Sequence, residues 1–302
     1  MANFDDLLSN TPAEESGAPQ LSSEEYAAKK KAEREEVFEL SDQTAMEVSA
    51  DGGAFQSFLD LQGRLDRYSA VNALLVFAQN KDASRLGSFD YWKRQNCSVR
   101  PGQTAISILE PHEYAKEDGS PGTGYNVKKV FDISQIDTRK LRNAPTPNYT
   151  ERQILGALIS KYPMKIIGVD ELPEGRFGES SAHLGAMTDV DGSILVRKGM
   201  EFSETFRSVA YEMAGAELAT DPELSPEQEF SAYSATYLLC KKYGADMREF
   251  DFDKVSDVFD GMEAQEVKGE LSQIRDAFEN ISGRMARQLE TQNRAAKSQE
   301  AR

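Results

Sequence analysis

A proline-rich break, RNAPTPN at 142–148, separates two segments that each carry helix and strand signals. Proline fixes φ and lacks an amide hydrogen, so two prolines this close disrupt any regular element. A chain of 302 residues is long enough for roughly two ordinary domains. The break therefore predicts a domain boundary between folded units at 55–145 and 150–285. We expect an acidic mobile arm at 1–50 and a polar tail at 286–302, because both ends have little apolar surface.

The first unit is expected to combine helices with strands. Apolar residues between 58 and 78 recur at steps of three and four, the period of a helix. A shorter helical segment ends near Asn96, a residue type that tolerates a left-handed helix stop. TAISIL (104–109) and YNVKKVFDIS (125–134) favour strands. The glycine- and proline-rich segment at 110–124 predicts a loop between them.

The second unit is also predicted to mix both kinds of element. A capping box at Thr150 and Gln153 begins a helix, and Asp191-Gly192 indicates a hairpin turn. A later helix should begin at Ser225 and end at Gly244. Apolar residues from 267 to 285 form a heptad-like seam, which could pack on its own domain or dock a partner protein. The fold class predicted for the whole chain is α+β.

Composition restricts the setting of the protein. No apolar run approaches the roughly 20 residues that a membrane-spanning helix requires. The N-terminus lacks the basic-then-apolar order of a signal peptide. Cys97 and Cys240 are far apart and have no metal-ligand spacing, which favours a reducing compartment. We expect a soluble, cytoplasmic protein with no membrane partner.

Charge is distributed unevenly along the chain. The net charge is −16, but residues 56–145 carry 13 Lys and Arg against 10 Asp and Glu. The segments on either side are strongly acidic. A partner with a phosphate backbone would therefore be attracted to the middle segment and repelled by the ends. A small positive excess is also within ordinary variation, so charge alone does not establish such a partner.

The middle segment carries a specific motif. It runs Tyr-Ser-x-x-Asn, Gln, Trp, Val-x-x-Gly and Phe-Asp-x-x-Gln, over about 80 residues. The matching positions are Tyr68, Ser69, Asn72, Gln79, Trp92, Val99, Gly102, Phe131, Asp132 and Gln135. The segment resembles the N-terminal single-stranded-DNA-binding domain of ArdC-like antirestriction proteins, which travel on plasmids and integrative elements. One departure is Asn96, where the family usually has glycine.

Aromatic and cationic residues interleave between 67 and 100, as binding to single strands requires, since bases stack on flat rings and cations follow phosphates. The predicted DNA contacts are Arg67, Tyr68, Asn72, Arg85, Tyr91, Trp92, Lys93, Arg94 and Arg100. Alternatives remain for three of them. Trp92 is favoured as a core anchor, and Tyr68 with Asn72 could form a buried hydrogen-bonded pair that holds a helix to the sheet.

Residues 150–247 resemble the zincin-like metallopeptidase domain that follows in the same family. The family's His-Glu-x-x-His helix matches YEMAG at 211–215, and a later ligand position falls on Tyr233. Tyr211 and Gly215 replace the two histidines, so only Glu212, the family's general base, remains. Catalytic zinc takes three protein ligands. The resemblance therefore implies a degenerate domain with no metal, no cofactor and no catalytic activity.

Three hypotheses about function follow. The first is a non-catalytic single-stranded-DNA-binding protein of a mobile element, with a role in antirestriction or conjugation support. The second is a protein-interaction module that uses its acidic arms or the 267–285 helix, with a vestigial DNA surface. The third is a residual metallopeptidase that uses Glu212 with unexpected ligands.

Overall fold

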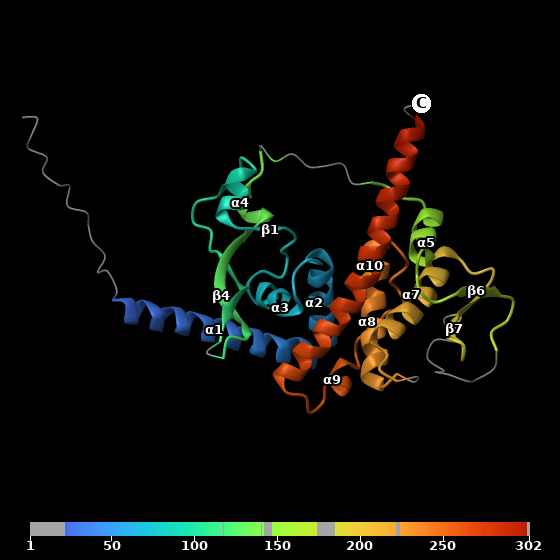
Figure 1. Cartoon of the computed structure of the whole chain (residues 1–302), viewed down its shortest axis with the longest axis horizontal. Helices are drawn as coiled ribbons and strands as arrows, with labels where there is room; N and C mark the ends of the chain where they lie inside the picture. Colours follow the sequence, from blue (N-terminus) through green and yellow to red (C-terminus); the bar gives the residue numbers. More distant parts are fainter. Residues whose placement is uncertain are drawn as a thin grey trace, which may run out of the picture.

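The computed structural model describes residues 22–116, 118–139, 141, 147–173, 185–221 and 224–300, with side chains up to 294. Most of the predicted boundary segment, residues 142–146, lies outside the described residues. Helices and strands both contribute to the fold, which confirms the α+β class (Figure 1). No helix within the described ranges is both long and apolar enough to cross a membrane.

Helix α1 (Ser23–Ala50) corrects the expectation of a mobile arm. Ser22 and Glu25 form a capping box at its start, and Val37, Ala45 and Val48 are buried. The helix contacts α2 (Gly52–Arg64), α3 (Ala70–Gln79) and α10 (Ala264–Glu300). Its apolar residues are few, but distant segments of the chain cover them. Residues 1–21, the rest of the predicted arm, lie outside the described residues.

The first half contains a three-stranded sheet in the order β1-β4-β3, from β1 (Leu86–Gly87), β4 (Pro121–Asp132) and β3 (Ile106–Ala115). Strands β3 and β4 form a long antiparallel hairpin from Ile106↔Val130 to Ala115↔Pro121. The loop predicted at 110–124 is therefore wrong over most of its length. Strands β2 (Ser98–Val99) and β5 (Ile136–Asp137) pair separately beside α4 (Phe89–Arg94), and a 3-10 turn, η2 (Ile133–Gln135), precedes β5.

The second half begins with α5 (Glu151–Ile159), which has the predicted capping box. Strand β8 (Ile194–Arg197) lies between β6 (Ile166–Val169), which is parallel to it, and β7 (Ala186–Thr188), which is antiparallel. The predicted turn between β7 and β8 is confirmed by Gly192, whose φ is +77°. Helix α7 (Phe202–Leu218) packs on this sheet, and α8 (Pro226–Tyr243) packs on α7. As predicted, α8 begins after Ser225 and ends at a left-handed Gly244.

Helix α10 joins the two halves, and a short helix, α9 (Val255–Val258), precedes it. The apolar seam from Val267 to Met285 is buried within the chain, so its packing is intramolecular. The polar tail expected from residue 286 is corrected as well, because α10 continues to Glu300 and Leu289 is buried. Buried residues of both predicted units belong to one cluster that extends from Ala45 to Leu289.

Candidate nucleic-acid interface and the Glu212 helix

Helix α4 is the centre of the predicted DNA surface. The Ser88 side chain accepts a hydrogen bond from the Tyr91 amide and so begins the helix. The predicted stop at Asn96 is confirmed, since its φ is 57°. The backbone amide of Cys97 then donates to the Trp92 carbonyl oxygen at 2.9 Å. This tight turn fixes which α4 side chains point inward.

Trp92 points inward and is fully buried. Its indole nitrogen donates to the carbonyl oxygen of Phe131 at 3.0 Å, and the ring packs with Cys97 and Ile136. A side chain in this position has no surface on which a base could stack. The prediction of Trp92 as a DNA contact is therefore corrected in favour of the core-anchor alternative.

Asn72 is held by the sheet. Its side-chain amide donates to the Leu109 carbonyl oxygen at 2.9 Å and accepts from the Leu109 amide at 2.8 Å. Gln79, two turns later on α3, pairs in the same way with the backbone of Ser107, at 2.9 Å in both directions. These amides cover the outer edge of β3 as a neighbouring strand would. Asn72 thus holds α3 to the sheet, as the alternative predicts, but it is half-buried and its partner is the Leu109 backbone rather than Tyr68.

Asp132 organises the end of β4. Burial pushes the pKa of its carboxyl group upward, but hydrogen bonds from Ser134 and from the amides of Arg85 and Ser84 outweigh this effect and lower the pKa. Gln135 accepts from the Asp132 amide at 2.8 Å and donates to the Thr104 carbonyl oxygen at 2.7 Å. Much of the motif in this half therefore stabilises the backbone.

The two tyrosines predicted as DNA contacts also have partners within the protein. Tyr68 is half-buried against the core, and burial raises the pKa of its phenol. The Tyr91 hydroxyl accepts from the Arg85 guanidinium at 2.7 Å. That guanidinium lies 5.5 Å from the centre of the Trp92 ring. Arg100 donates to the carbonyl oxygens of Ile136 and Ser134, which fixes its direction.

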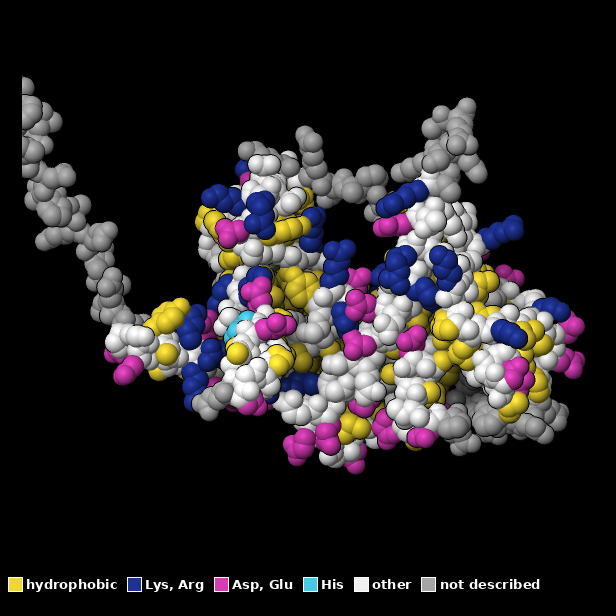
Figure 2. All heavy atoms as spheres, viewed as in Figure 1, with side chains coloured by type: hydrophobic (Ala, Val, Ile, Leu, Met, Phe, Trp, Pro, Cys, Tyr) yellow, Lys and Arg dark blue, Asp and Glu magenta, His cyan; other side chains and the backbone are white. Residues whose placement is uncertain are grey.

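Lys93 and Arg94, in the last turn of α4, are the cations best placed to reach a ligand. Both are exposed, as is Arg67, and within the described residues none of the three has a carboxylate partner within 4.0 Å. Figure 2 shows Lys and Arg side chains gathered over the α4 region. Phe89, one turn before Lys93, is 58% exposed. Sequence reasoning placed Phe89 in this stretch but did not choose it as a contact, because a sequence does not show which aromatic ring faces outward.

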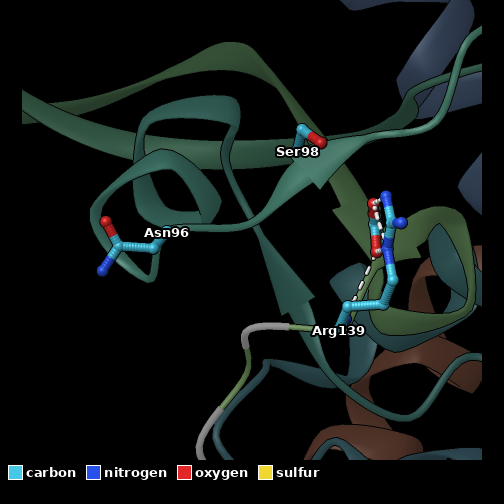
Figure 3. A pocket seen from close by; sticks show the side chains of 4 residues that line it. Asn96, Ser98 and Arg139 are labelled. Carbon is cyan, nitrogen blue, oxygen red and sulfur yellow. Dashed lines mark hydrogen bonds and ion pairs between the residues drawn. The ribbon is translucent and has the colours of Figure 1, made fainter.

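A shallow depression lies beside this surface, lined by Asn96, Ser98, Asp137 and Arg139 (Figure 3). Hydrogen bonds from Arg139 lower the pKa of Asp137 to about 2. The two side chains therefore form an ion pair, with the Arg139 Nε 2.9 Å from the nearer Asp137 carboxylate oxygen. The depression consequently offers little uncompensated charge.

Glu212 lies in the middle of α7 and is buried. The Thr188 hydroxyl donates to its Oε2 at 2.6 Å. Its Oε1 is buried without a hydrogen-bond partner among the described residues. Gly215 contacts the side chain of Leu224, since a Cβ built at this position would lie 3.1 Å from the Leu224 Cδ1. An apolar side chain thus lies against the position that the resemblance aligns with the second histidine.

The other two positions that the resemblance aligns with ligands hold tyrosines that pack or hydrogen-bond within the protein. Tyr211 is buried in the core. The Tyr233 hydroxyl donates to the Glu249 carbonyl oxygen at 3.2 Å and accepts from the Asp251 amide at 2.7 Å, while burial raises the pKa of its phenol. Among the described residues, no group of three or more His, Cys, Asp and Glu is arranged to hold a metal ion. His183 lies outside the described residues.

Comparisons with known proteins give fold-level neighbours. No family model matches the sequence, and no curated protein matches it. The metal-free crystal structure of the antirestriction ArdC protein from plasmid R388 is 14% identical, covering 73% of this chain and 86% of that chain, with a TM-score of 0.45. The Mn(II)-bound structure of the same protein is 12% identical, covering 74% and 85%, also with a TM-score of 0.45. Both neighbours carry the name of the family that the sequence motifs resemble.

Proposed function

We propose that this protein binds single-stranded DNA through the α4 surface, defined as Phe89, Lys93 and Arg94. The observation that carries the proposal is the pair Lys93 and Arg94, exposed and without carboxylate partners among the described residues, beside the exposed ring of Phe89. Cations attract the phosphate backbone, and an exposed ring stacks on an unpaired base of any sequence. Arg85 and Arg100 add positive charge from fixed positions.

Fluorescence anisotropy with a labelled oligonucleotide tests this proposal. The protein should bind at about 50 mM salt, and its affinity should fall steeply as salt rises, because binding releases counterions. Lys93→Glu/Arg94→Glu should weaken binding about tenfold or more and flatten the salt dependence. Lys161→Glu/Lys165→Glu is the matched control, since it reverses two exposed lysines in the other half. Absence of binding by the wild type at this salt concentration contradicts the proposal.

We further propose that the Glu212 half has no metallopeptidase activity. The packing of Leu224 against Gly215 and the hydrogen bonds of Tyr233 support this. Zinc chemistry requires three protein ligands and an open position for water. Metal analysis of the purified protein tests the proposal directly. Stoichiometric zinc in the wild type that is absent from Glu212→Gln would support the residual-metallopeptidase hypothesis instead.

The biological role that the sequence motifs suggest is antirestriction or conjugation support within a mobile element. Protection of incoming DNA in a host with an active restriction system provides the assay. If DNA binding carries the role, Lys93→Glu/Arg94→Glu should lose protection while the matched control keeps it. Protection that is independent of these residues contradicts a DNA-based mechanism.

Of the two docking surfaces in the interaction-module hypothesis, the 267–285 seam is buried within the chain, so only the acidic arm remains as a candidate. The acidic arm can still be tested by deletion. The deletion should end at residue 21, since removing α1 would uncover Val37, Ala45 and Val48. If the arm rather than the DNA surface carries the role, this deletion abolishes protection.

A further inference from the structure

The outer half of the β3–β4 hairpin carries two aromatic residues opposite two glycines. His112 pairs with Gly124, and Tyr114 pairs with Gly122. A Cβ built on Gly124 would lie 2.7 Å from the imidazole Nε2 of His112, and one built on Gly122 would lie 2.7 Å from the Tyr114 Cζ. The rings therefore lie across the glycine backbones. Any larger residue at either glycine would displace a ring.

The two rings form a continuous surface, which we call the hairpin platform, defined as His112 and Tyr114. Their centres are 6.4 Å apart and their planes are inclined by 45°. His112 is exposed and Tyr114 is 49% exposed. Strand β4 links the platform to the α4 region, since it pairs with His112 and Tyr114 at one end and its Phe131 accepts the Trp92 indole hydrogen bond at the other.

The opposite face of the hairpin packs partly on α1, although Tyr125 on that face is still 40% exposed. Tyr125 contacts Phe38 of α1, with ring centres 5.9 Å apart, and Lys129 pairs with Glu33 of α1 at 3.1 Å. At the base of the hairpin, residues on the platform's own face, such as Ile108, are buried in the core. Only the outer part of this face remains open, and there the chain places aromatic rings.

We propose that the hairpin platform is a base-stacking site for the single strand that the α4 surface binds. This inference rests on the proposed function and adds a second contact to it. Cross-strand packing of an aromatic ring on glycine also stabilises a hairpin, but it leaves the outer faces of both rings open to a ligand. Flat rings accept any unpaired base.

The charges near the platform differ from those on the α4 surface, and this predicts a different contribution to binding. Glu110, on the same face, forms an ion pair with Lys128, and Glu113 lies on the other face. At the hairpin tip, exposed Lys116 and Asp118 carry opposite charges, so the platform has little net positive charge with which to attract phosphate. Stacking there should strengthen binding without releasing counterions, whereas contacts made by Lys93 and Arg94 release them.

The test measures oligonucleotide affinity across a salt series for the full chain. Tyr114→Ala should weaken binding about fivefold or more with an unchanged salt slope, and Tyr114→Phe should retain wild-type affinity, because the ring is what stacks. Tyr125→Ala is the matched control on the opposite face of the hairpin and should bind as the wild type does. Unchanged binding by Tyr114→Ala overturns the platform but leaves the proposed function intact.

Photo-cross-linking gives a readout that does not depend on variant stability. An oligonucleotide with a photoreactive base should cross-link to the wild-type protein at His112 or Tyr114, as mapped by mass spectrometry. Cross-links confined to other segments overturn the platform. If the wild type fails to bind at all, the proposed function fails first, so the two failures are distinguishable.

Discussion

Asn72, Gln79 and Asp132 in the first half of the chain have backbone partners for their side chains, whereas Glu212 in the second half has one buried oxygen without a partner among the described residues. Both halves carry a motif, and in the first half the structure shows what the motif residues do, which is to support the backbone. Amide and carboxylate side chains there satisfy strand edges and turns. In the second half, the side chain of Leu224 packs beside Gly215, a position that the resemblance aligns with a metal ligand.

This difference shows where function should be sought in each half. In the first half, the motif residues provide the support, and the proposed ligand contacts are neighbours such as Lys93 and Phe89, which the motif does not include. In the second half, the motif residue Glu212 is itself unusual, because one of its oxygens is buried without a hydrogen-bond partner among the described residues. Burying a carboxyl group with only one hydrogen bond lowers the stability of the fold. Substitutions around Glu212 are therefore more informative than substitutions around the motif of the first half.

Trp92→Ala is expected to have the largest effect, a loss of about 3–5 kcal/mol in the free energy of unfolding, because it empties a fully buried site. Urea unfolding measures this. Phe89→Ala removes an exposed ring from the same helix and should change stability by less than about 0.5 kcal/mol. Equal stability of the two variants would contradict the assignment of Trp92 to the core and of Phe89 to the surface.

Asp132→Asn should cost about 1–3 kcal/mol near neutral pH, since an amide cannot accept from all of the donors that surround this carboxylate. The folded-state pKa of Asp132 is lowered, so its contribution is present above the ordinary carboxyl pKa and is lost as pH falls through the folded-state value. The difference in unfolding free energy between wild type and variant should therefore narrow below about pH 4.

The control for this pH series is Asp82→Asn, at an exposed position, which should follow the wild type. A difference between wild type and Asp132→Asn that stays constant from neutral to acid pH would show that the Asp132 carboxylate is not the group that titrates.

Glu212→Gln should have a small effect, a change of less than about 1 kcal/mol, because glutamine has nearly the same shape and can still accept the Thr188 hydrogen bond. Thr188→Val is the informative partner variant. It leaves the buried carboxylate without its hydroxyl donor and should cost about 1–3 kcal/mol. Thermal unfolding compares the two. A loss of more than about 1 kcal/mol in Glu212→Gln would contradict this expectation.

Local signals in the sequence predicted individual elements well. The caps at Thr150 and Ser225, the turn at Gly192 and the helix stops at Asn96 and Gly244 are all present. Each depends on a few neighbouring residues whose backbone preferences are intrinsic. The replacement of the family's ligand types at Tyr211, Gly215 and Tyr233 stays a prediction, because it rests on the resemblance of the sequence motifs.

What only the tertiary structure decided depends on contacts between distant residues. Helix α1 is ordered because segments far along the chain cover Val37, Ala45 and Val48. The 110–124 segment extends the hairpin because glycines on one strand accept rings from the other. The burial of Trp92 and the exposure of Phe89 follow from which side of α4 meets the β4 strand. Local sequence sets backbone preference, but burial is a property of the assembled core, so it was settled only when the chain folded.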